Sequence, residues 1–69
     1  MITETNRNLI RSTKAVATAL DSYFAGDWEL EEVNDAIDQC NRDLHPEGID
    51  PDIAALATEV IELATLIKD

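Results

Sequence analysis

The chain has 69 residues, of which fifteen are acidic and five are basic, so its formal net charge at neutral pH is −10. This charge disfavours direct binding to nucleic acids and to anionic membranes, because both surfaces are negative. The single cysteine excludes an internal disulfide, and a chain this short buries only roughly 60% of its unfolded surface. We therefore expect further stability to come from oligomerisation, as a homodimer.

The acidic side chains are concentrated in the middle of the chain. Residues 1–25 hold three basic and two acidic side chains, whereas residues 26–50 hold nine acidic side chains against Arg42 alone. Residues 51–69 hold four acidic side chains and one basic side chain. A negative field of this kind raises the encounter rate with basic proteins, so the middle third is the candidate recognition surface.

The first predicted helix spans about residues 5–25. Its apolar residues follow the helical period along one stripe, with a second apolar edge beside the stripe. Gly26 ends the pattern. The stripe consists of Leu9, Val16, Leu20, Tyr23 and Phe24, with Ile2 ahead of it, and the edge consists of Ile10 and Ala17.

The second predicted helix spans about residues 28–44. Asp27 stands at the expected N-cap, and Trp28 stands at the first helical position. Apolar residues then recur at intervals of 3, 4, 3 and 4, which is the spacing of a packed helical seam. This seam consists of Leu30, Val33, Ile37, Cys40 and Leu44.

The third predicted helix spans about residues 51–67. Pro46 interrupts the second helix, because the residue before a proline disfavours the helical conformation, and Gly48 permits a turn with positive φ. Asp50 and Pro51 then start a helix, since Asp is a favoured N-cap and proline is favoured at the first helical position. A second seam with the same intervals consists of Ile53, Leu56, Val60, Leu63 and Ile67, flanked by Ala57, Ile61, Ala64 and Leu66.

Together, these patterns predict one all-α domain over residues 1–69, folded as a three-helix up-down-up bundle. A helix that packs on one side needs an apolar stripe of about 100°, and the first and third helices are apolar over a wider angle. We expect the extra apolar edges to bind a second copy of the chain.

Neither a signal peptide nor a membrane span is expected. Polar residues follow Ile2, where a signal peptide would have an apolar stretch. The longest apolar run, residues 53–57, is far shorter than the roughly 20 residues that cross a bilayer. The sequence therefore predicts a cytoplasmic protein.

Four carboxylates of the second predicted helix form the candidate recognition site. They lie at i, i+3 and i+4 spacings, which places neighbours roughly 6 Å apart. Like charges this close cost stability, so their presence suggests a use: such a row can imitate a nucleic-acid backbone for a basic protein partner. The alternative is a solvated acidic face that serves only solubility. The four residues are Glu31, Glu32, Asp35 and Asp38.

Two aromatic residues complete the candidate partner-binding site. Trp28 lies off the buried seam, and tryptophan is enriched among interface hot spots. Its alternative role is to hold the corner between the first two helices by packing on Tyr23 or Phe24. Tyr23 also suits an interface, because its ring is apolar and its hydroxyl is polar, and the rim of the core is its alternative place.

No catalytic, cofactor-binding or metal-binding residues are expected. Cys40 falls on the buried seam, where a free cysteine acts as a small hydrophobe. A zinc site at Cys40 and His45 would need at least two further ligands, and the chain has no second Cys or His. We expect His45 to end the second helix instead.

These observations favour a non-enzymatic protein that binds and inhibits or regulates another protein. A nucleic-acid-binding host factor, such as a transcription regulator or a CRISPR effector, has the complementary basic surface. Small acidic chains without catalytic residues are typical of phage or plasmid inhibitors and of antitoxins. Two alternatives stay open: a homodimeric scaffold whose acidity serves only solubility, and adaptation to a salty cytoplasm.

Overall fold

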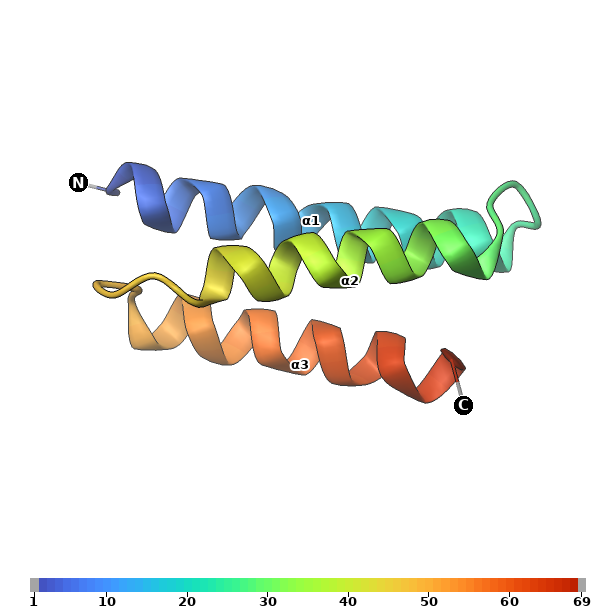
Figure 1. The fold of residues 1–69 in the computed structure, drawn as a ribbon. Coiled ribbons are helices and arrows are strands. Elements are labelled where there is room, and N and C mark those ends of the chain that lie inside the picture. The colour runs from blue at the N-terminus through green and yellow to red at the C-terminus, as the bar shows by residue number, and fades with distance from the viewer. Residues whose placement is uncertain (1, 69) are drawn as a thin grey trace.

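Three α-helices account for most of the chain in the computed structural model, which describes residues 2–68 (Figure 1). They are α1 (Glu4–Phe24), α2 (Leu30–Leu44) and α3 (Pro51–Lys68), and no strand occurs in the described range. The three helices pack against one another. The prediction of an all-helical bundle is therefore confirmed.

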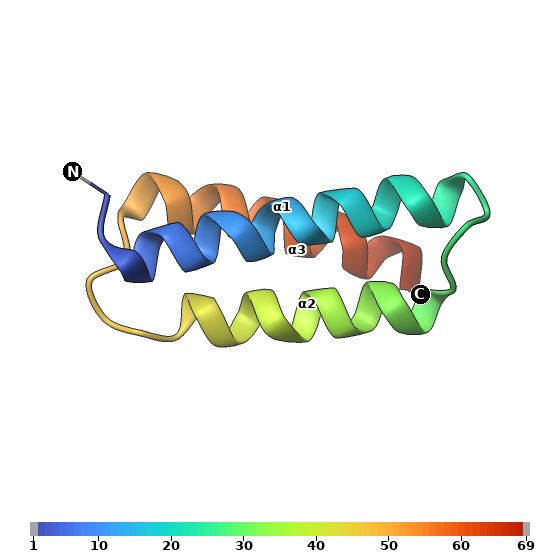
Figure 2. The same ribbon diagram turned by 90° about the horizontal axis from the view of Figure 1, so that it is seen from above.

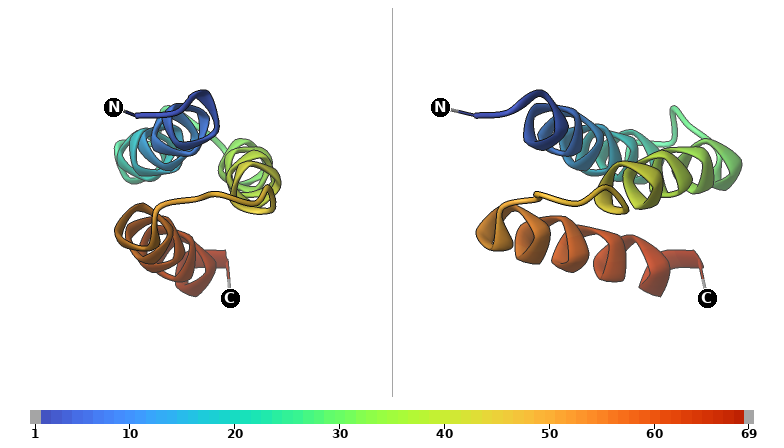
Figure 3. Two further views of the ribbon diagram at one scale, coloured as in Figure 1. Left: turned by 90° about the vertical axis from the view of Figure 1, so that its left-hand side faces the viewer. Right: turned by 60° about the vertical axis from the view of Figure 1, so that its left-hand side comes forward.

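α1 is the helix that holds the bundle together. It packs extensively against both other helices, whereas the contact between α2 and α3 is the smallest. The α1–α2 connection lies at one end of the molecule, and the α2–α3 connection lies at the other (Figure 2). Seen along the bundle (Figure 3, left), the helices form a triangle in which α2 stands to one side of α1 and α3. This arrangement leaves an outer face of α1 and α3 that α2 does not cover.

The C-terminal end of α1 explains why α2 begins later than expected. Gly26 adopts a φ of +84°, and the N–H of Asp27 donates to the carbonyl of Ser22 at 2.9 Å. The N–H of Trp28 also donates to this carbonyl, at 3.3 Å. This pattern is a glycine C-cap of the Schellman type. The expectation that Asp27 caps α2 is therefore wrong, because its backbone completes α1, and Glu29 occupies the N-cap position of α2.

The end of α2 and the start of α3 both occur at the residues that the sequence predicted. His45 is the C-cap of α2, and Gly48 has a φ of +85°. The side-chain Oδ1 of Asp50 accepts a 2.9 Å hydrogen bond from the N–H of Asp52, directly around Pro51. The predicted N-cap of α3 is confirmed.

The hydrophobic core uses the seam predicted for the second helix. Val33, Ile37 and Cys40 are buried, and Leu30 and Leu44 pack against the core at its edges. α1 completes the core with three buried side chains, and α3 completes it with two alanines. These are Leu9, Val16 and Ala19 of α1 and Ala57 and Ala64 of α3.

α3 turns a different part of its surface inward than its seam suggested. Ala57 and Ala64, which flank the predicted seam, are fully buried. Leu56 and Leu63, which belong to the seam, are 56% and 59% exposed. Small side chains at a helix contact allow the helix axes to approach closely, which suits the alanines to the inner face. The larger leucines are left on the outside of the bundle.

Two polar contacts link α1 to α2 inside the bundle. The hydroxyl of Ser12 donates to Oδ2 of Asp43 at 2.5 Å, and Oγ1 of Thr13 lies 3.6 Å from Sγ of Cys40. Both hydroxyl residues are buried, and each also donates to a carbonyl of its own helix, Ser12 to that of Asn8 and Thr13 to that of Leu9. The two contacts fix how the middle of α1 sits against the C-terminal half of α2.

Candidate partner-binding site

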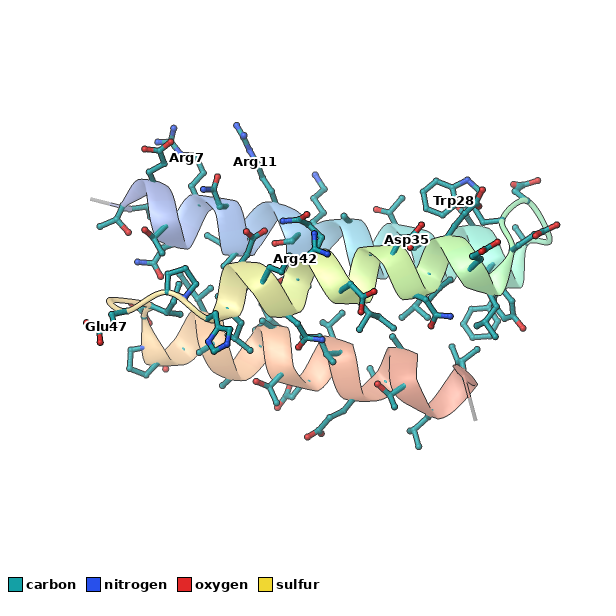
Figure 4. All side chains as sticks on the ribbon, in the orientation of Figure 1. Arg7, Arg11, Trp28, Asp35, Arg42 and Glu47 are labelled. Atoms are coloured by element: carbon teal, nitrogen blue, oxygen red, sulfur yellow. The ribbon has the colours of Figure 1, made fainter. Side chains whose placement is uncertain are left out.

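α2 presents three carboxylates to solvent along one line. Glu31, Asp35 and Asp38 are exposed, and their spacings of four and three residues place them on the side of α2 opposite its buried seam (Asp35 in Figure 4). We call this line the acidic face. It is the part of the predicted site that is open to a large partner.

The fourth predicted carboxylate belongs to a groove of about 640 Å³ between α1 and α2. Glu32 and Asp35 line this groove from α2, and Arg11 and Lys14 line it from α1. Trp28 also lines it, near the end of the bundle that carries the α1–α2 connection (Figure 4). The two cations attract the two carboxylates across the groove, so they reduce the negative potential on this side of α2. On the other side of α2, Glu31 and Asp38 do not line this groove, and exposed Arg42 follows Asp38 by four residues on the same line.

Trp28 keeps a large part of its side chain available for contact. It is 40% exposed, and the residues that line the groove beside it include the small side chains of Ala15, Thr18 and Ala36. Small neighbours leave room above the groove floor for a side chain of a partner. Trp28 is thus a half-exposed aromatic side chain at one end of the groove.

Tyr23 lies apart from this groove. Its ring packs edge to face on Phe24, with a centroid separation of 6.0 Å and an interplanar angle of 62°. Tyr23 is half-buried against the hydrophobic core, while Phe24 is 70% exposed. The structure therefore brings Trp28 together with Glu32 and Asp35, and it places Tyr23 at the rim of the core.

The basic side of α1, of which Arg11 and Lys14 line the groove, was not predicted as part of the site. Arg7, Arg11 and Lys14 follow one another at intervals of four and three, which places them on one side of α1. All three are exposed (Arg7 and Arg11 in Figure 4). That spacing was the signal available in the sequence. The proximity of these cations to the carboxylates of α2 depends on how the two helices pack.

A second groove, of about 490 Å³, lies between α1 and α3 and is almost entirely apolar. The sequence indicated spare apolar edges on both helices but not that these edges would meet. The groove is lined by Ile10, Thr13, Lys14, Ala17, Ile53, Leu56 and Val60. It lies on the outer face that α2 leaves uncovered.

Cys40 is a buried structural residue. Burial raises the pKa of its thiol above the ordinary value of 9.0, and the negative charge of Asp43 raises it further. Hydrogen bonds with Thr13 and Ser12 act in the opposite direction. The net effect is a thiol that stays protonated and is poorly reactive at neutral pH.

Within residues 2–68, no group of three or more His, Cys, Asp or Glu side chains is arranged to hold a metal ion. None of the helices in that range is long and apolar enough to cross a membrane. Comparisons with models of known protein families, with curated proteins and with solved structures find no match. The acidic face, the groove beside Trp28 and the apolar groove are the candidate binding surfaces of the chain.

Proposed function

We propose that this chain is a non-enzymatic cytoplasmic protein that binds a basic surface of another protein and thereby inhibits or regulates it. The partner we favour is a nucleic-acid-binding factor, such as a transcription regulator or a CRISPR effector. The observation that carries the proposal is the exposed line of Glu31, Asp35 and Asp38 along α2. A rigid helix holds these carboxylates in a fixed row, as a nucleic-acid strand holds its phosphates.

Binding begins with electrostatic steering. A net charge of −10 on a small surface attracts a basic partner and raises the association rate by roughly 10-fold to 1,000-fold. The acidic face then contacts the basic groove of the partner. Blocking that groove prevents nucleic acid from entering it, which is how binding becomes inhibition.

Trp28 supplies the apolar anchor beside the acidic face. Large aromatic side chains contribute most to affinity when they fill a pocket of the partner and exclude water. Arg11 and Lys14 line the same groove from α1. A partner that fits both the acidic face of α2 and the cations of α1 carries a basic patch next to a smaller acidic patch. The pairing of these two patches with opposite charges fixes the orientation of the complex.

The first test is a pull-down from the native host followed by mass spectrometry. The baits are the wild-type chain, a variant with Glu31, Asp35 and Asp38 changed to Lys, and a control variant. The control changes Glu4, Asp21 and Glu47 to Lys; these residues are exposed, lie outside α2 and give the same net charge. We expect the wild type and the control to retain the same proteins and the α2 variant to lose them. Equal recovery with all three baits would show that the acidic face is inert.

A recovered protein is then purified and mixed with the wild-type chain in stopped-flow experiments. The association rate should fall steeply from low to physiological ionic strength, because salt screens charges over about 8 to 10 Å. A rate that does not depend on ionic strength would contradict steering. The same recovered protein should lose its binding to DNA or RNA when the wild-type chain is added, and retain it when the α2 variant is added.

The Trp28→Ala variant tests the anchor separately. We expect it to weaken the complex by about 2 kcal/mol or more, mainly through faster dissociation. Phe24→Ala is the matched control, because Phe24 is also an exposed aromatic residue but does not line the groove. If both substitutions weaken binding equally, Trp28 is not a specific anchor.

The second candidate function is a structural one, in which the helices run up, down and up and two copies form a scaffold. It is favoured by the exposed leucines of α3, since exposed apolar patches mark contact surfaces. Under this proposal the acidic face serves only solubility, so the three Lys substitutions on α2 leave the function intact.

If the acidity is instead an adaptation to salt, the wild-type chain will unfold in dilute buffer and refold in molar salt.

A further inference from the structure

The outer face of α1 and α3 repeats apolar residues every seven positions. Ile10, Ala17 and Phe24 of α1 are all exposed, and so are Leu56 and Leu63 of α3. A seven-residue spacing keeps side chains on one side of a helix, so each helix contributes a continuous apolar line. The apolar groove of about 490 Å³ lies between these lines and is lined by three of the five residues. We call this surface the α1–α3 face.

α3 turns small side chains inward and large ones outward. Ala57 and Ala64 are fully buried, whereas Leu56 and Leu63 are more than half exposed. The inner alanines allow the helices to approach closely, and the leucines, which carry more apolar area, are left on the α1–α3 face. A partner that covers these leucines would remove that apolar area from water and gain stability by doing so.

The two rims of the face carry opposite charges. Lys14 is exposed on the α1 rim and lines the groove together with Leu56 and Val60. Glu59 is exposed next to Val60 and lies beside Leu63 on the opposite, α3 rim. Lys14 and Glu59 therefore stand at about the same height along the bundle, on either side of the apolar surface.

We propose that the α1–α3 face binds the same face of a second copy of this chain, about a two-fold axis parallel to the helices. Rotation about such an axis keeps each residue at the same position along the bundle and exchanges the α1 rim with the α3 rim. α1 of each copy then packs on α3 of the other, and Lys14 meets Glu59 of the partner subunit. Two such ion pairs form, one on each side of a shared apolar core made by four helices. A two-fold axis that lies in the face and runs perpendicular to the helices would instead pack α1 on α1 of the other copy, so each Lys14 would lie on the same rim as the partner's Lys14 and not opposite the partner's Glu59.

The distribution of acidic residues supports a second copy as the occupant. α2 stands on the side of the bundle opposite the α1–α3 face (Figure 3). In the proposed dimer the two α2 helices therefore lie on opposite outer surfaces, as far apart as the molecule allows. This placement minimises repulsion between two chains that each carry a charge of −10. It also leaves both acidic faces free.

The size of the face is at the lower limit for a specific dimer. α3 has 18 residues, which span about 27 Å at 1.5 Å per residue. Two adjacent helices, each about 10 Å across, give a width of about 20 Å. The footprint is about 540 Å² per copy and about 1,080 Å² for the pair, which just exceeds the roughly 1,000 Å² that a specific interface needs.

This inference rests on the homodimer of the second candidate function and is independent of whether the acidic face binds a partner. Analytical ultracentrifugation tests it with full-length variants. Lys14→Glu and Glu59→Lys each place like charges across the proposed interface, so each should weaken the dimer about tenfold or more. The double variant restores opposite charges and should dimerise like the wild type. An equimolar mixture of the two single variants should also dimerise, because both pairs in the mixed dimer are attractive.

Two control substitutions change charge by the same amount away from the face. They are Arg11→Glu and Asp38→Lys, at exposed positions that do not line the apolar groove. Neither should affect self-association beyond the change in net charge. Leu56→Ala combined with Leu63→Ala removes the apolar contact and should give a helical monomer, with helicity checked by circular dichroism.

Each other outcome overturns a defined part of the inference. A wild-type chain that stays monomeric at millimolar concentration excludes both the homodimer and this interface. A dimer that responds equally to the face variants and to the controls retains the homodimer but excludes the α1–α3 face. Weakening by both single variants without rescue in the mixture excludes the proposed two-fold axis.

Discussion

The amide oxygen Oδ1 of Asn6 accepts a hydrogen bond of 2.8 Å from the backbone N–H of Asp50, a residue 44 positions later in the chain. The amide nitrogen of Asn6 donates to Oγ1 of Thr3 at 2.8 Å and to the carbonyl of Gly48 at 3.3 Å. Asn6 is buried. One side chain thus joins the first turn of α1 to the loop that starts α3, and it holds the two helices that form the apolar groove.

Replacing Asn6 by Ala should lower the free energy of unfolding by about 2 to 3 kcal/mol, because it leaves the loop carbonyl and the N–H of Asp50 without partners. Urea denaturation followed by circular dichroism measures the change. Asn8→Ala is the control, since Asn8 is an exposed residue of the same helix. An equal loss in both variants would show that the Asn6 contacts contribute nothing specific.

Gly48→Ala should destabilise the chain by about 1 kcal/mol through backbone conformation alone. Gly48 has a φ of +85°, and a Cβ atom at this position would meet no atom within 4 Å. Gly48→Asn should cost less than Gly48→Ala, because asparagine tolerates positive φ better than alanine does. Thermal unfolding of the three chains checks this order. The reverse order would mean that contacts, and not backbone strain, decide the effect.

Asn34→Leu should stabilise the fold by about 1 kcal/mol. The amide oxygen Oδ1 of Asn34 is buried on α2 and has no hydrogen-bond partner among residues 2–68. A buried polar atom without a partner costs about 1 to 3 kcal/mol, and leucine of similar size removes that atom. Urea denaturation at neutral pH gives the value. A destabilised Asn34→Leu chain would show that the site cannot accept an apolar side chain.

Cys40 should make the stability of the fold fall at alkaline pH. Burial raises the pKa of its thiol above the ordinary value of 9.0, so the folded chain retains a proton that the unfolded chain releases. The resulting stabilisation is fully present below the unfolded pKa and is lost as pH rises toward the folded pKa. The stability difference between the wild type and Cys40→Ala should therefore be smaller at about pH 10 than at about pH 7. A difference that is the same at both pH values would contradict the raised pKa.

The predicted seam of α2 is the part of the core that the sequence describes best. Leu30, Val33, Ile37, Cys40 and Leu44 form a narrow stripe on an otherwise polar helix, so only one rotation about the helix axis buries them. α3 has no such constraint. Its apolar surface is wide, and several rotations bury a similar amount of it, so periodicity alone does not tell whether Ala57 or Leu56 faces inward.

The candidate site is likewise only partly predictable from the sequence. The exposure of Glu31, Asp35 and Asp38 follows from their position opposite a narrow buried stripe. The position of Trp28 does not follow from the sequence pattern, because it depends on how the Gly26 turn completes α1 and on how α1 packs beside α2. Arg11 and Lys14 become part of the groove because α1 packs beside α2.

The sequence by itself determined where α1 and α2 stop and where α3 starts, since Gly26, His45 and the Asp50–Pro51 pair act within a few residues of backbone. The tertiary structure alone decided which side of α3 became the α1–α3 face. It also decided that Asn6 would join two segments far apart in sequence. These features depend on packing between helices, whose free energy includes contacts that no local pattern of residues records.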